Sequence, residues 1–115
     1  MKLPNRERAV VPEAKTAGYL LSETHPHGRH KASFFRRFGF VPSNLETLAS
    51  VLLLHVTLHD VIKVEDTPFG KRYTIEGELT VPDGRTPLVR SVWFVENGED
   101  FPRFVTAYPL GRREE

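Results

Sequence analysis

The sequence predicts an α+β fold in which two to three N-terminal helices pack on one face of an antiparallel four-stranded meander sheet. Apolar residues recur at helical spacing in the first half of the chain, and alternation of apolar and polar residues replaces that pattern after Asp60. Short turn-forming segments then divide the second half into four alternating runs. The chain has 115 residues, of which 39% are hydrophobic, enough for one core. We therefore expect a single domain over residues 1–115, with 111–115 as a frayed tail.

The N-terminal half starts with a short extended piece at residues 9–11, followed by Pro12, which suits the first turn of a helix. Ser43 and Glu46 have the spacing of a capping box, and Gly39 can end the preceding helix with a left-handed cap. The last helix is apolar around most of its circumference, so we expect it to lie against the sheet. The three predicted helices cover about 13–22, 29 or 30 to 39, and 43 to about 59.

The second half predicts four strands, of which the last two flank a turn at residues 97–100. Asn97 and Gly98 tolerate the positive φ of a tight reversal, so we expect these two strands to form the central hairpin of the sheet. Gly77 is expected to form a β-bulge. The runs cover residues 61–65, 71–81, 88–95 and 104–110. Alternation places Val89, Ser91, Trp93 and Val95 on one face of the third run, Leu88, Arg90, Val92 and Phe94 on the other, and Phe104, Thr106, Tyr108 and Leu110 together on one face of the fourth.

Composition excludes several classes of function. The 16 basic and 15 acidic residues leave a net charge of +1, so no global field draws the protein to nucleic acid or to a membrane. The absence of cysteine excludes disulfides, thiolate metal sites and a cysteine nucleophile. We see no signal peptide and no apolar run long enough for a membrane span, and we expect a cytoplasmic protein. Positive charge gathers locally at Arg29, His30, Lys31, Arg36 and Arg37.

Arg90 is a candidate site residue because it interrupts a strand that is otherwise largely apolar. Burying an unpaired guanidinium costs several kcal/mol, which is on the order of the whole free energy of unfolding of a small domain. Arg90 must therefore meet a partner or line a cleft. The alternative is an arginine that extends from a sheet edge into solvent.

A loop at residues 23–31 contains His25, His27 and His30, whose side chains titrate in the range used for acid and base catalysis. Arg29, His30 and Lys31 also stand at the predicted start of a helix, where anions bind and extra cations are otherwise unfavourable. This segment predicts contact with a phosphate group, the alternative being a solvated basic face.

A metal site is not expected, and neither is any other cofactor. His55 and His59 have the i, i+4 spacing of two zinc ligands on a helix, but no third ligand accompanies them. We interpret the pair as the polar edge of the third helix. Glycine-rich phosphate loops and the serine nucleophile elbow are also missing from the sequence.

The segments LPNRERAVV, HPHGRHKASFFRRFGF and VRSVWFVENGEDFPRFVTAYPL resemble a family of small bacterial domains of unknown function over nearly the whole chain. The ending RFVTAYPL also resembles the last strand of the barnase, EndoU, colicin and RelE group of ribonuclease toxins. In that group a His or Lys near the early helices, a basic residue on a middle strand and a late Thr or Ser with an aromatic residue line the RNA cleft. The resemblance implies a catalytic set of His25 or His30, Lys31, Arg90, Thr106 and Tyr108.

The activity implied by this resemblance is metal-independent RNA cleavage of bacterial toxin type, by attack of the 2′-hydroxyl on phosphate. A histidine or Tyr108 would transfer protons, and Lys31 with Arg90 would stabilise the phosphorane. Thr106 would donate a hydrogen bond to a non-bridging oxygen, and Tyr108 or Trp93 would stack on a base. Further contacts with RNA are expected from His27, Arg29, Arg36, Trp93 and Arg103.

The competing hypothesis is a non-enzymatic interaction module, such as an immunity or antitoxin partner, that binds through Trp93 and Phe104. If the protein is instead the toxin, a cognate antitoxin or immunity protein is its expected partner. An exposed strand at residues 61–65 could also pair with a second chain, which would give a homodimer. Convergence of Arg90, Thr106 and Lys31 around one concavity would favour the enzyme.

Overall fold

The computed structural model describes residues 1–12, 45–81, 84 and 86–110. The four strands form one antiparallel sheet in the order β1-β2-β3-β4, which confirms the α+β class and the four-stranded meander. The helices predicted over 13–22 and 29–39 lie outside the described residues. The described residues form a 3-10 turn, η1 (Arg6–Arg8), one α-helix, α3 (Leu45–Leu58), and the strands β1 (Val61–Thr67), β2 (Gly70–Glu78), β3 (Leu88–Glu96) and β4 (Arg103–Pro109).

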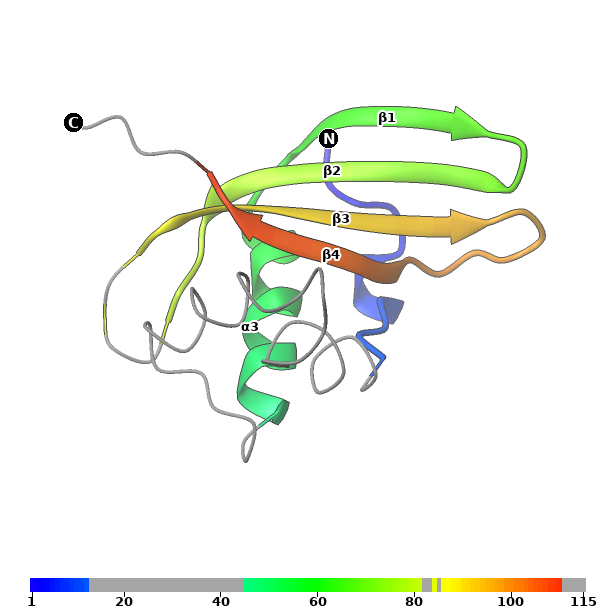
Figure 1. Ribbon diagram of the computed structural model, residues 1–115. Coiled ribbons are helices and arrows are strands. Elements are labelled where there is room, and N and C mark those ends of the chain that lie inside the picture. The colour runs from blue at the N-terminus through cyan, green and yellow to red at the C-terminus, as the bar shows by residue number, and fades with distance from the viewer. Residues whose placement is uncertain (13–44, 82–83, 85, 111–115) are drawn as a thin grey trace, which may run out of the picture.

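Helix α3 covers one face of the sheet, as predicted, and the core lies between the two (Figure 1). The predicted alternation of β3 is confirmed, because Val89, Ser91 and Trp93 on the helix side are fully buried while Leu88 and Arg90 on the other side are not. The largest buried side chains are Leu3, Leu48, Leu52, His55, Val56, Ile75, Leu79, Trp93 and Phe104.

The hairpin of β3 and β4 lies at one side of the sheet and not at its centre, which corrects the sequence prediction. β3 is an inner strand, but β4 is the last strand in the sheet order. Its outer side meets the predicted extended piece near the N-terminus. The Val10 N–H donates to the Pro102 carbonyl, and the Phe104 N–H donates to the Val10 carbonyl, both at 2.9 Å.

A bulge in β4 changes which side chains share a face. Val92 is opposite Thr106, but Trp93 is opposite Phe104, so Val105 is an extra residue in the ladder. Phe104 therefore turns into the core, at 1% exposure, while Thr106 and Tyr108 remain on the other face. The prediction that these three side chains share a face was wrong for Phe104, because the alternation of apolar and polar residues does not reveal an inserted residue.

Gly77 is not a bulge, contrary to the prediction. It pairs regularly with Val89, and the irregularity beside β2 falls at Ile62 of β1. Gly77 is instead a point of close approach. A Cβ atom on this residue would lie 2.3 Å from Cγ of the His59 ring. His59 holds that position by a 2.7 Å hydrogen bond between Nε2 and the Glu78 carbonyl.

His55 belongs to the core and not to a polar edge of α3, contrary to the prediction. At 1% exposure, its Nε2 lies 3.1 Å from the Gly77 carbonyl and its Nδ1 lies 3.0 Å from Oγ of Ser91. A carbonyl only accepts, so Nε2 carries the hydrogen and the Ser91 hydroxyl donates to Nδ1. The Ser91 oxygen in turn accepts from Nε1 of Trp93 at 2.9 Å. Burial lowers the pKa of His55 below 6.5, which favours this neutral form.

Within the described residues, no three His, Cys, Asp or Glu side chains gather closely enough to hold a metal ion. The described part of the chain also contains no helix long and apolar enough to cross a membrane.

Candidate functional site on the open sheet face

The sheet face away from α3, called here the open face, carries a group of polar side chains drawn from all four strands. The register explains the grouping, because cross-strand partners in an antiparallel sheet point their side chains to the same side. Glu76 of β2 is opposite Arg90 of β3, and Arg90 is opposite Tyr108 of β4. Two positions along, Thr74, Val92 and Thr106 form a second such row. β1 adds Lys63 and Glu65 opposite Thr74 and Arg72.

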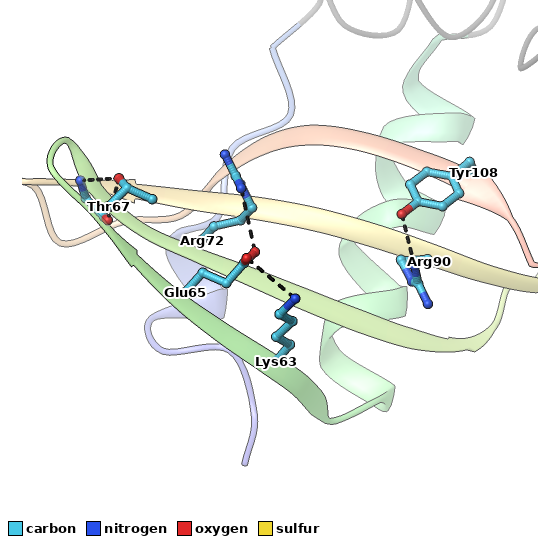
Figure 2. Close-up of polar contacts among 7 residues, drawn as sticks. Lys63, Glu65, Thr67, Arg72, Arg90 and Tyr108 are labelled. Carbon is cyan, nitrogen blue, oxygen red and sulfur yellow. Dashed lines mark hydrogen bonds and ion pairs between the residues drawn. The ribbon is translucent and has the colours of Figure 1, made fainter.

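Arg90 is the centre of this group. Its Nε and Nη2 both donate to Oε2 of Glu76. Its Nη1 donates to the Tyr108 hydroxyl at 3.2 Å, as Figure 2 shows. The guanidinium carbon also lies 5.6 Å from the centre of the Tyr108 ring, within range of a cation–π contact. A carboxylate and a phenol from two neighbouring strands therefore flank one cation.

A hollow of about 350 Å³ lies beside Arg90. Thr74 and Val92, each 8% exposed, belong to the middle of the sheet and are nearly covered. Figure 2 shows Lys63 and Glu65 of β1 and Arg72 of β2 as one group, and Arg90 with Tyr108 as another, farther along the sheet. The residues that line the hollow are Ile62, Lys63, Glu65, Arg72, Thr74, Arg90, Val92 and Tyr108. Arg90 thus lines a cleft and has a partner, as its position in the sequence required.

The charged groups of the open face carry a small excess of positive charge around Arg90. Hydrogen bonds with Tyr108 and then with Glu76 raise the pKa of Arg90, so the guanidinium is a permanent cation. Glu65 lies between two more cations, with 3.5 Å to Nζ of Lys63 and 3.6 Å to Nη1 of Arg72. Three cations and two carboxylates thus meet here. Arg90 is about a third exposed, so an incoming group can reach it.

The structure brings together three of the predicted catalytic residues, Arg90, Thr106 and Tyr108, on one face. Trp93, predicted to stack on RNA, is fully buried against Phe104, with 5.2 Å between the ring centres. That prediction was wrong, because β3 turns Trp93 toward α3. Six of the predicted residues lie outside the described residues: His25, His27, Arg29, His30, Lys31 and Arg36.

Arg103 lies on the open face but away from the hollow. It is opposite Phe94, four residues along β3 from Arg90, or about 13 Å. Its guanidinium lies 5.4 Å from the ring centre of Phe101 and 3.4 Å from a carboxylate oxygen of Glu99. Arg103 therefore belongs to the hairpin turn and not to the Arg90 group.

Sequence reasoning missed four polar lining residues, Lys63, Glu65, Arg72 and Thr74, and it also missed Glu76, the partner of Arg90. The alternation of residues 71–81 already placed Thr74 and Glu76 on one face. Their distance from Arg90 depends on the β2–β3 register, which alternation does not determine. Glu76 would have been found by asking which acidic residue can pair with Arg90.

The fold and this site define a small α+β protein with a cation-centred hollow on the exposed face of its sheet. Residues 2–111 match the family described as a domain of unknown function (DUF6883), and the chain belongs to this family. Among curated proteins, no sequence matches the chain.

One solved structure with a similar fold is a chain of a contact-dependent growth inhibition toxin–immunity protein complex from Klebsiella pneumoniae 342. The two chains share 19% identity, with a TM-score of 0.70. The match covers 88% of this chain and 99% of the other. The similarity extends over nearly the whole of both chains and concerns their fold.

Proposed function

We propose that this protein is a metal-independent ribonuclease of bacterial toxin type, with its active site in the hollow beside Arg90. The observation that carries the proposal is the row of Glu76, Arg90 and Tyr108 across three adjacent strands. It offers a proton acceptor, a cation and a proton donor side by side, which are the groups that 2′-hydroxyl attack on phosphate needs.

In this proposal Arg90 binds the non-bridging phosphate oxygens and stabilises the charge that develops on the phosphorane. Thr106, on the same face, donates a hydrogen bond to the phosphate, and the Tyr108 ring offers a surface for a base. Glu76 joins His25 and His30 as a candidate to take the 2′-hydroxyl proton. Lys31, Arg29, Arg36 and His27 extend the phosphate contacts along the RNA.

The structural neighbour supports a toxin role, since it belongs to a complex of a growth inhibition toxin with an immunity protein. The same complex also supports the second candidate, an immunity-like module, because it contains both components. Trp93 and Phe104 do not provide the surface predicted for that module, as both are buried. In either role we propose a cognate protein partner.

Labelled RNA, including tRNA, incubated with the protein in the presence of EDTA tests the proposal. We expect cleavage that leaves 2′,3′-cyclic phosphate ends. The cleavage rate should decrease on both sides of neutral pH, since one group must be deprotonated and another protonated. Glu76→Gln keeps the size of the side chain but removes the base, and should lower the rate about 10²- to 10⁴-fold if Glu76 takes the proton. No cleavage of any RNA at micromolar protein would favour the interaction module.

A further inference from the structure

Among the residues that the structure describes, no strand pairs with the outer edge of β1, and the hydrogen bonds of the neighbouring strands show which of its backbone groups point outward. The Asn97 N–H donates to the Phe69 carbonyl, and the Leu79 N–H donates to the Pro87 carbonyl. Odd-numbered residues of β2 therefore direct their backbone groups to β3, and even-numbered ones direct theirs to β1. The strand lies along one side of the sheet (Figure 1), and no described element pairs with its outer side.

The register of β1 then determines which of its backbone groups point away from β2. Lys63, Glu65 and Thr67 are opposite the even residues of β2 and use their backbone groups in that ladder. Val64 and Asp66 direct their N–H and C=O groups away from the sheet. Ahead of the bulge at Ile62, the Val61 N–H is satisfied by the Met1 carbonyl at 2.7 Å, so the open edge begins after Val61.

We propose that a second copy of this chain pairs antiparallel with β1, with Val64 of each copy at the two-fold axis. The two Val64 residues then exchange a pair of backbone hydrogen bonds. In this register Lys63 is opposite Glu65 of the second copy, and Glu65 is opposite Lys63, so the contact has two complementary charge pairs.

Charge selects this register over its neighbours. Only even-numbered residues have outward backbone groups, so the pairing can shift only in steps that keep even residues opposite each other. The next register in one direction places Lys63 opposite Lys63, and the next in the other direction places Glu65 opposite Glu65. Each brings like charges together at the axis, which is unfavourable.

Side-chain exposure fits a contact at this edge. Val64 is 43% exposed and Ile62 is 56% exposed, although both are apolar. Lys63 is itself well exposed, so it can turn from Glu65 of its own chain to Glu65 of the second copy. An antiparallel pair of this kind keeps the open faces of both copies on the same side of one continuous sheet. The two hollows would then lie on one surface.

The mass in solution, measured by light scattering from low micromolar to near-millimolar protein, tests the proposal. The contact is one short strand pair, so we expect a dimer dissociation constant on the order of 10 to 100 µM. The monomer has a mass of 13.1 kDa, and the dimer twice that. A monomeric mass at every concentration would overturn the proposal.

Three variants test the register. Val64→Pro removes an N–H that the β1–β2 ladder does not use, so the monomer should fold and no dimer should form. Lys63→Glu should weaken the dimer about tenfold or more, and adding Glu65→Lys should restore it, because the charges are again complementary. Melting curves at low concentration verify that each variant folds. A dimer that persists in folded Val64→Pro, or a failure of the double variant to recover, would show that β1 is not the contact.

Discussion

Ser91→Ala should destabilise the protein strongly, although it removes a single hydroxyl group. This hydroxyl donates to Nδ1 of His55 at 3.0 Å and accepts from Nε1 of Trp93 at 2.9 Å. All three residues are buried to 1% exposure or less. Alanine leaves one buried acceptor and one buried donor without a partner, each at a cost of about 1–3 kcal/mol. We therefore expect the free energy of unfolding to fall by about 2–5 kcal/mol.

Urea denaturation followed by the fluorescence of Trp93, the single tryptophan, measures this change directly. Ser50→Ala is the matched control, since Ser50 is exposed on α3 and its replacement should change the free energy by less than about 0.5 kcal/mol. A loss below about 0.5 kcal/mol for Ser91→Ala would refute the assignment of Ser91 as the shared partner of His55 and Trp93.

Three further predictions follow from the same structure. Because burial lowers the pKa of His55 below 6.5, the unfolded chain protonates His55 more readily than the folded chain does. The contribution of His55 to the free energy of unfolding should be complete above about pH 6.5 and should decline as the pH falls below that value. His55→Gln should reduce this decline, as measured by urea titrations at several pH values. Gly77→Ala should cost about 1–3 kcal/mol because its Cβ would overlap the His59 ring, and adding His59→Ala should remove most of that penalty, so additive losses would contradict the overlap. Arg90→Ala should lower the free energy of unfolding by no more than about 1 kcal/mol, since its pairing with Glu76 is partly exposed; a loss of 3 to 5 kcal/mol in thermal melts would mean a structural ion pair.

Alternation predicted the strands and their faces well where pairing is regular. In β3 it separated the buried side of Ser91 and Trp93 from the side of Arg90. It failed at β4 because Val105 is an extra residue in the ladder. Such a bulge cannot be recognised from the pattern of apolar and polar residues. Gly77 was misassigned because its lack of a Cβ atom makes room for the His59 ring and does not mark a bulge.

The candidate site was predictable in part. Arg90 stood out because a cation on a central strand needs a partner, and the structure provides Glu76 and Tyr108. The identity of that partner depended on strand register, which follows from the whole meander and not from local residues. The assignment of His55 to the polar edge of α3 was wrong, since a neutral imidazole whose two nitrogens both meet partners can be buried as His55 is.

The rate of RNA cleavage by Arg90→Ala relative to the unmodified protein, measured with EDTA present, tests the central claim most directly. We expect a loss of about 10²- to 10⁴-fold, because the guanidinium stabilises charge that develops in the transition state. Lys71→Ala is the control, since it removes one exposed cation from the opposite side of β2 and should leave the rate nearly unchanged. Equal rates in the unmodified protein and in folded Arg90→Ala would contradict an active site on the open face.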